Sequence, residues 1–216
     1  MLSIQPRVTS GGDGLTPEQI VLERARNLAG LIPENLDQAN GQKEQFKKTN
    51  NLLPSLTTVL VQEMDKFNRL LVRMRQTLED LEKAIHGIML MSSDLDAMFL
   101  SLQNGKVPAL WEDVSYLSMK PLASWFDDLI KRCEFMNDWL VNGQPTAFWI
   151  SGFFFPQGFL TGTLQTHARI YKIPIDELKF SFRIMEFEEP EEVEEKPEDG
   201  VFVYGLFMDG ARYNRD

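Results

Sequence analysis

The chain has very little cysteine and histidine. Cys133 is the only cysteine among 216 residues, so no disulfide can form within the chain. Structural disulfides belong mainly to oxidising compartments, and a lone cysteine therefore favours a reducing one. The two histidines, His86 and His167, lie far apart in the sequence and have no cysteine beside them. This spacing is not that of a zinc site, and we predict no metal site.

Signals for secretion and membrane insertion are also missing. The first ten residues, MLSIQPRVTS, lack the basic and apolar regions of a signal peptide, and the chain has no Asn-X-Ser/Thr glycosylation site. No uninterrupted apolar run approaches the ~20 residues that a membrane-spanning helix needs. We therefore expect a soluble intracellular protein that has no membrane partner.

The motifs of common enzyme classes are absent. No Gly-X4-Gly-Lys-Ser/Thr segment occurs, so the chain has no phosphate cradle of the P-loop kind. Ser151 lies in Ile-Ser-Gly, which does not satisfy the Gly-X-Ser-X-Gly nucleophile motif. The acid pairs Asp127-Asp128 and Asp94/Asp96 lie near predicted helix starts, where carboxylates usually face the helix dipole or solvent. We predict no catalytic residue and no cofactor in this chain.

A basic surface is missing as well. The net charge is −10, and residues 186–199 alone carry −8 of it, so the rest of the chain is nearly neutral. Nothing in the composition favours nucleic acid or anionic lipid as a partner. The acidic segment contains Pro190 and Pro197 and lacks the glycine-and-oxygen alternation of a calcium loop. It is predicted to be an exposed, flexible loop between two strands.

Helical patterns fill the first two thirds of the chain. Thr16-Pro17-Glu18-Gln19 predicts a helix with a capping box at its start, and Pro33 should end it. Residues 34–51 are polar and predict a mobile connection. A long helix is then predicted from Ser55 to Met89, because apolar residues alternate at spacings of four and three: Leu60, Met64, Phe67, Leu71, Met74, Leu78, Leu81, Ile85 and Ile88. Such a stripe fits either a self-associating coiled coil or an intramolecular bundle, and the apolar faces of later helices favour the bundle.

Two further helices are predicted before the chain changes in character. They cover 94–103, capped by Ser92 or Ser93, and 121–142. Residues 148–155 then predict an extended segment, and Pro156 the start of a helix. Alternating apolar residues predict a strand over 179–187, and the apolar run over 201–208 predicts a second one. Residues 1–8 predict a short strand. Helices followed by strands around a final helix indicate the α+β class.

Six large aromatic residues gather between positions 148 and 159. Each buries roughly 150–250 Å² when it enters a core, so the segment belongs to a core, an interface or both. Phe153, Phe154 and Phe155 are consecutive and cannot all face one side of a strand. A core role is the favoured interpretation. The alternative is that at least one of the three contacts another domain, and we name all three as a candidate interdomain contact.

Five segments, in order, resemble the C-terminal domain of dynein heavy chains. The resemblance covers about residues 53–216 and is closer to the axonemal type, from cilia and flagella, than to the cytoplasmic type. Residues 1–45 are similar to the end of the small, lid-like part of the sixth AAA+ module. The segments are VLVQEMDKFNRLL, LEKAIHGIMLMSSDLDAMFLSLQNGKVPALW, KPLASWFDDLIKR, FWISGFFFPQGFLTGTLQTHARIYKIPID and DGVFVYGLFMDGARYNRD.

The resemblance implies three regions and a fold. Residues 1–45 would end the AAA+ lid, 46–145 would be the helical part of the C-terminal domain, and 146–216 its β-rich part. The implied fold is α+β: a helical bundle followed by an incomplete antiparallel β-barrel or sheet with one packed helix. Family members continue with further strands beyond the position of Asp216, so we expect a barrel truncated at its C-terminus and a chain that tends to self-associate.

The resemblance also implies a role. The domain would be a non-catalytic structural and regulatory part of an ATP-driven, minus-end-directed microtubule motor, packed on the AAA+ ring of the same heavy chain. ATP and Mg²⁺ would bind elsewhere in the parent, and the microtubule would be bound through other parts. Dynein intermediate and light chains would be partners in the complex, and the location would be the cytoskeleton of the ciliary or flagellar axoneme.

Two alternatives come from other functional classes. One is a standalone α+β scaffold that binds partners through the heptad stripe and the aromatic patch. The weakest alternative is a small-molecule enzyme with a pocket under the aromatic residues.

Overall fold

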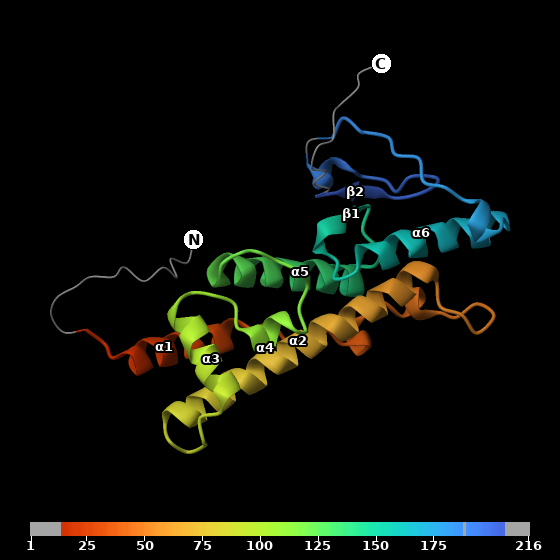
Figure 1. Ribbon diagram of the computed structural model, residues 1–216. Helices are drawn as coiled ribbons and strands as arrows, with labels where there is room; N and C mark the ends of the chain where they lie inside the picture. Colours follow the sequence, from red (N-terminus) through yellow and green to blue (C-terminus); the bar gives the residue numbers. More distant parts are fainter. Residues whose placement is uncertain (1–13, 188, 206–216) are drawn as a thin grey trace. The chain divides into compact units, whose positions relative to one another are not determined.

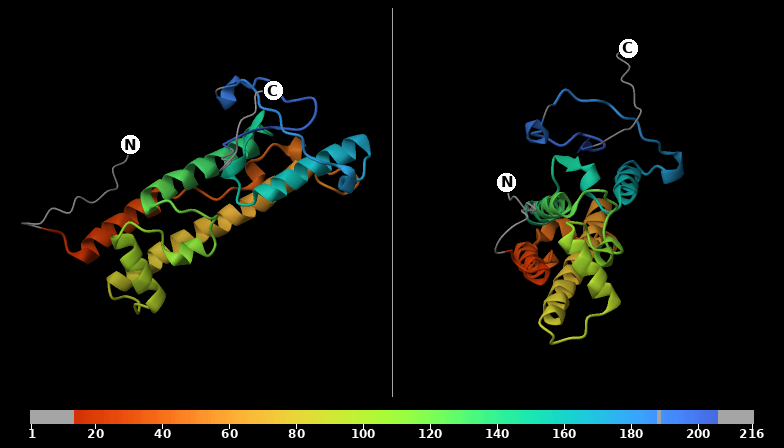
Figure 2. Two further views of the ribbon diagram at one scale, coloured as in Figure 1. Left: turned by 45° about the horizontal axis from the view of Figure 1, so that its top comes forward. Right: turned by 60° about the vertical axis from the view of Figure 1, so that its left-hand side comes forward.

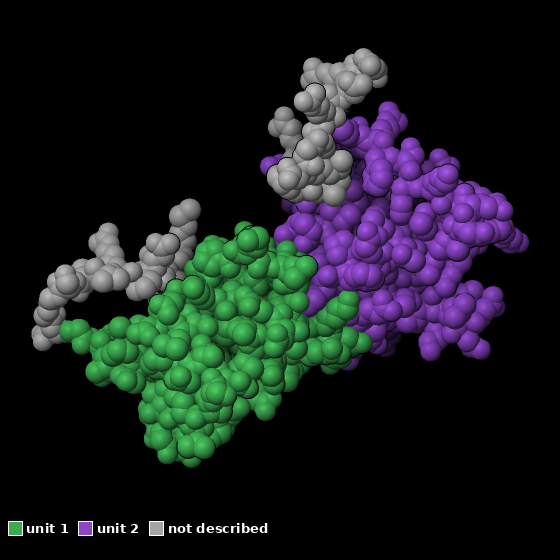
Figure 3. Space-filling view, in the orientation of Figure 1, with its two compact units in different colours: residues 1–37, 64–134 green, residues 38–63, 135–216 purple. Residues whose placement is uncertain are grey.

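The computed structural model describes residues 14–187 and 189–205 (Figure 1). These residues form two compact units, which are coloured separately in Figure 3. Unit 1 contains residues 14–37 and 64–134, and unit 2 contains residues 38–63 and the described residues from 135 onward. The regular elements in these ranges are α1 (Pro17–Leu31), α2 (Ser55–Ile85), α3 (Ser93–Gln103), α4 (Ala109–Glu112), α5 (Leu122–Asn142), β1 (Ala147–Trp149), α6 (Pro156–Tyr171) and β2 (Phe202–Tyr204).

Short 3₁₀ helices occupy several of the connections. They are η1 (Gln38–Asn40), η2 (Lys43–Phe46), η3 (Ile150–Gly152), η4 (Ile175–Glu177) and η5 (Pro190–Glu192). The first two lie in the polar stretch before α2, where a mobile connection is predicted from composition.

Helix α1 begins as the sequence predicts. The Thr16 hydroxyl accepts from the backbone N–H of Gln19, and the Gln19 side chain accepts in return from the backbone N–H of Thr16 at 2.8 Å. Later in the helix, Arg24 is buried against α3, which lies beside α1 in each view (Figures 1 and 2). Its guanidinium donates to the backbone carbonyls of Leu102 and Gln103. A cation at the last carbonyls of α3 stabilises the end of that helix.

The apolar stripe of α2 is buried within the chain. The seven stripe residues from Leu60 to Leu81 are each at most 2% exposed. This confirms the intramolecular bundle and not the self-associating coiled coil. The helix ends at Ile85, earlier than predicted, because Gly87 adopts a φ of +70° that an α-helix cannot continue. Ile88, the last stripe position, is consequently 76% exposed.

Three aromatic rings form the centre of unit 1. Trp125 of α5 stacks on Trp111 of α4 and on Tyr116, with ring centroids 5.9 and 6.1 Å apart. The Trp111 indole N–H donates to the Thr77 hydroxyl of α2 at 2.9 Å. A buried indole thus has its hydrogen bond satisfied, and α4 is tied to α2.

The described strands pair in parallel and not in an antiparallel barrel. β1 and β2 form a two-stranded sheet in which Ala147, Phe148 and Trp149 pair with Phe202, Val203 and Tyr204. The predicted incomplete antiparallel barrel is therefore wrong for the described residues, which are mostly helical. Of the α+β assignment, the structure confirms only the coarser statement that a mostly helical chain carries a small sheet.

The predicted strand over 179–187 is wrong as well. These residues have no regular structure, and Phe182 and Ile184 are 72% and 68% exposed. Alternating apolar residues provide a strand with two faces, but a strand forms only when a neighbouring backbone supplies hydrogen bonds. The prediction for 201–208 is confirmed over Phe202–Tyr204. Residues 206–208 and the short strand expected at 1–8 lie outside the described residues.

Among the described residues, none of the helices combines the length and the apolar character needed to cross a membrane.

Candidate interaction site at the aromatic segment

The aromatic segment forms the core of unit 2. Phe153 stacks on Phe159 of α6 with centroids 4.7 Å apart, and Phe148 of β1 lies 4.8 Å from the same ring. Trp139 of α5 meets Phe148 edge-on at 5.1 Å. All four side chains are buried. Edge-on and offset ring pairs of this kind stabilise a core beyond their buried area. The predicted core role is confirmed for Phe148, Phe153 and Phe159, whereas Trp149 and Phe154 are half-buried.

One buried carboxylate holds the triple phenylalanine in place. Glu63 of α2 is 2% exposed and accepts the backbone N–H of Phe154 at 2.6 Å and that of Phe155 at 3.1 Å. Each of these two N–H groups donates to a different carboxylate oxygen, so the turn before α6 is fixed to α2 at two adjacent peptides. Charged acceptors make stronger hydrogen bonds than neutral ones.

The three candidate contact residues therefore lie on one clamped turn but differ in exposure. Phe153 is buried, Phe154 is half-buried, and the Phe155 ring is 53% exposed. The Phe155 ring lies over the start of α6, where a Cβ on Gly158 would come within 2.7 Å of the ring. Phe155 is the member of the triple that offers a surface, and the interdomain contact stays a prediction.

Nothing in the sequence points to the Glu63 clamp. Its partners are 91 and 92 residues away, and no local pattern links an acid on α2 to backbone amides after β1. The only available signal is a charged residue directly before stripe residue Met64, and that position alone does not indicate burial.

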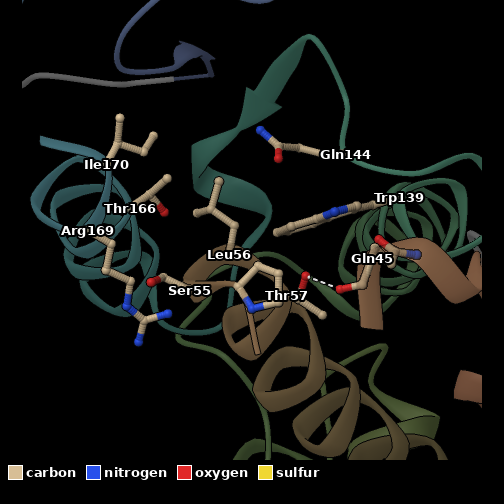
Figure 4. Close-up of a pocket in the computed structure, with 10 residues that line it drawn as sticks. Gln45, Ser55, Leu56, Thr57, Trp139, Gln144, Thr166, Arg169 and Ile170 are labelled. Atoms are coloured by element: carbon tan, nitrogen blue, oxygen red, sulfur yellow. Dashed lines mark hydrogen bonds between the residues drawn. The ribbon is translucent and has the colours of Figure 1, made fainter. Parts of the chain in front are cut away.

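A pocket opens beside the aromatic core at the N-terminus of α2 (Figure 4). Its volume is about 270 Å³, and it lies between the first turn of α2, the end of α5 and the last turns of α6. Ser55, the first residue of α2, is 4% exposed and lines the pocket. Within the described residues its hydroxyl has no hydrogen-bond partner, and neither has Oε1 of Gln45.

A second, smaller pocket of about 160 Å³ lies where the acidic segment meets α6. His167 of α6 pairs there with Asp199, with Nδ1 2.7 Å from the carboxylate, and packs on Tyr171. His167 is thus only partly exposed. Val193 is buried, so the acidic segment contacts the body of unit 2 at more than one point.

In unit 1, one carboxylate departs from its expected solvent-facing role. Asp128 is buried and accepts from Lys120 and Arg132, each at 2.7 Å. Burial raises the pKa of Asp128, but the two cationic donors outweigh it and hold the pKa below its ordinary value. The Arg132 guanidinium lies 4.0 Å from the centre of the Tyr116 ring.

The surroundings of Cys133 and His86 favour structural roles over chemical ones. Cys133 is buried, and burial raises the pKa of its thiol to about 12, which leaves it unreactive at neutral pH. His86 is exposed near the end of α2, 3.9 Å from Glu82. Across residues 14–187 and 189–205, no three His, Cys, Asp or Glu side chains gather as metal ligands would.

The comparisons with known proteins agree with the resemblance. The family model for the C-terminal domain of the dynein heavy chain matches residues 1–216. The chain belongs to this family. The relatives of this chain include dynein axonemal heavy chain 6 of Homo sapiens, which is 44% identical over 99% of this chain. Dynein axonemal heavy chain 1 of Rattus norvegicus is also 44% identical over 99%, and dynein axonemal heavy chain 12 of the same species is 42% identical over 100%.

The match covers a small part of each relative. This chain spans 6% of the length of heavy chain 6, 5% of heavy chain 1 and 7% of heavy chain 12. The family assignment therefore concerns this dynein C-terminal domain, and the activities of the much longer relatives do not follow from it directly. The division at residues 45 and 145 stays a prediction.

Proposed function

We propose that the chain is the structural and regulatory C-terminal domain of an axonemal dynein heavy chain and has no catalytic activity of its own. The observation that supports this most strongly is the identity of about 44% to axonemal heavy chains across 99% of this chain. In this proposal the domain packs on the AAA+ ring of its own heavy chain, in the ciliary or flagellar axoneme.

The other partners follow from the same proposal. ATP and Mg²⁺ are bound by other modules of the parent, and the microtubule is reached only through other parts of it. Dynein intermediate and light chains belong to the surrounding complex. In this protein, the turn carrying Phe155 is the proposed contact with the ring, because Glu63 fixes its backbone while the Phe155 side chain is 53% exposed.

The test uses the full heavy chain in a microtubule-gliding assay. Phe155→Ser should change gliding velocity while ATP binding stays intact, because it removes an apolar contact without disturbing the backbone bonds to Glu63. Phe182→Ser is the matched control, since that ring is more exposed and lies outside the clamped turn. Deleting residues 53–216 should change motility more strongly. Unchanged motility after the deletion would contradict the regulatory role, and unchanged motility after Phe155→Ser alone would contradict the contact residue.

The scaffold alternative loses one of its two binding surfaces. It requires the heptad stripe of α2 to be free for partner helices, and residues Leu60 to Leu81 of that stripe are buried in the protein's own cores.

A further inference from the structure

The pocket at the start of α2 has the features of a binding site that the proposed motor role does not use. It lies at the N-terminus of a 31-residue helix and is lined by the residue before the helix, Pro54, and by Ser55, Leu56 and Thr57 of its first turn. The first turn of an α-helix leaves backbone N–H groups without an intrahelical acceptor, and the helix dipole adds a partial positive charge there. Pro54 has no side-chain acceptor, and the first turn contains no acidic residue.

The Ser55 hydroxyl is an independent indication of a ligand site. Ser55 is only 4% exposed, it lines the pocket, and no described residue hydrogen-bonds to its hydroxyl. Leaving a buried hydroxyl without a partner is energetically unfavourable. Such groups normally have a hydrogen-bond partner, and a polar group of a molecule in the pocket would supply one.

The charges around the pocket favour an anion. Arg169 of α6 is the only charged residue among the described residues that line it, and one of its N–H groups donates to the carbonyl of Leu53 at 2.9 Å. That bond holds the guanidinium beside the start of α2. Figure 4 shows the Ser55 hydroxyl pointing toward the side of the pocket where Arg169 lies. Helix N–H groups, a hydroxyl and a guanidinium together match the donors that bind phosphate or carboxylate.

We propose that this pocket binds the anionic group of a small ligand whose apolar part lies against Leu56, Trp139 and Ile170. The anionic group is a phosphate monoester or a carboxylate, which share this chemistry. The volume of about 270 Å³ lies just below the range of drug-sized ligand pockets, and it suits a body the size of one aromatic ring. The proposal does not depend on the motor role.

The first test titrates the ¹⁵N-labelled 216-residue chain with phenyl phosphate, benzoate and benzyl alcohol. The two anions should shift the backbone amides of Ser55, Leu56 and Thr57 in a saturable way. Benzyl alcohol, which has the same ring without the charge, should bind about tenfold more weakly, because it loses the charge-assisted hydrogen bonds. Whichever of phenyl phosphate and benzoate binds more tightly shows whether the pocket prefers a phosphate monoester or a carboxylate. Equal binding of all three compounds, or shifts that map elsewhere, would overturn the proposal.

Variants then test the named donors by the same titration. Arg169→Gln should weaken the tighter anion about tenfold, and Ser55→Ala should weaken it less. Ser55→Ala should leave stability to urea unchanged or higher, because it removes an unpartnered hydroxyl. Arg73→Gln is the matched control, an exposed arginine of α2 outside the pocket. An equal loss in the Arg73 variant would overturn the proposal. If the Arg169→Gln variant does not fold, the Ser55→Ala titration and the comparison of the three compounds still test whether the pocket binds an anion.

Discussion

Among the charged side chains of the described residues, Glu63 is the most deeply buried, at 2% exposed. Its two oxygens satisfy adjacent amides in a turn that leads from β1 into α6. Glu63→Ala should lower the free energy of unfolding by about 2–4 kcal/mol, since two partly buried N–H groups lose a charged acceptor. Glu63→Gln keeps one acceptor oxygen and should cost about half of that. Urea unfolding monitored by tryptophan fluorescence measures both values.

A glutamate on the surface of the same helix provides the control for this substitution. Glu79 pairs with Lys83 at 2.7 Å in solvent. Exposed pairs of this kind contribute little, so Glu79→Ala should leave the urea midpoint nearly unchanged. Equal effects at the two positions would contradict the clamp.

Asp128 should make stability depend on pH. Its pKa in the folded chain lies below the ordinary value for an aspartate, because Lys120 and Arg132 donate to the carboxylate. A depressed pKa stabilises the fold above the unfolded pKa, and this stabilisation disappears as pH falls through the folded pKa. Asp128→Asn should therefore be less stable than wild type at pH 7, and the difference should shrink below about pH 4. The measurement is urea unfolding at a series of pH values.

The adjacent acid is a close control for Asp128. Asp127 is exposed and one residue away on α5, so Asp127→Asn should change stability little at any pH. A difference between Asp128→Asn and wild type that persists undiminished at low pH would show that packing, and not the ion pairs, explains the loss.

Two glycines inside helices should respond oppositely to the same substitution. A Cβ on Gly162 of α6 would lie 2.7 Å from Cγ2 of Val59 on α2, whereas a Cβ on Gly30 of α1 would meet nothing within 4 Å. At either site, alanine is more favourable than glycine in a helix by about 1 kcal/mol. Gly30→Ala should therefore raise the melting temperature. Gly162→Ala should lower it, because Val59 is branched at Cβ and has little freedom to move away. Differential scanning calorimetry tests both, and a gain at both sites would mean that α6 packs less closely on α2.

Helices were predictable from this sequence because their signals are local. The Thr16–Gln19 box and the spacing from Leu60 to Leu81 each lie within one helix, and both are confirmed. Strands were not predictable in the same way. Residues 179–187 alternate well but lack a backbone partner among the described residues, whereas Ala147–Trp149 pairs with a strand more than fifty residues later.

The site was only partly predictable for the same reason. The aromatic composition of the segment that contains Phe153–Phe155 predicts a core, an interface or both. Glu63, Ser55 and Arg169 have ordinary sequence surroundings, and their roles arise only when α2 and α6 are brought together. Asp128 has the appearance of a helix-start acid until its Lys120 and Arg132 partners are seen.

For the molecule as a whole, the exposed apolar residues after α6 predict self-association. Phe180, Phe182, Ile184, Met185 and Phe187 are each at least 38% exposed within one segment that has no regular structure. Exposed apolar segments with unpaired backbone groups readily pair with other molecules. Sedimentation velocity should show a sedimentation coefficient that rises with protein concentration.

Two double variants identify the segment responsible. Phe182→Asp with Ile184→Asp should make the protein monomeric, because the charges oppose both burial and strand pairing. Leu117→Asp with Met119→Asp is the matched control: these side chains are fully exposed in unit 1 and do not belong to this segment. The control should associate like wild type. A wild-type protein that stays monomeric at high concentration would contradict the prediction, and equal relief by both double variants would assign the association to general surface hydrophobicity instead of residues 180–187.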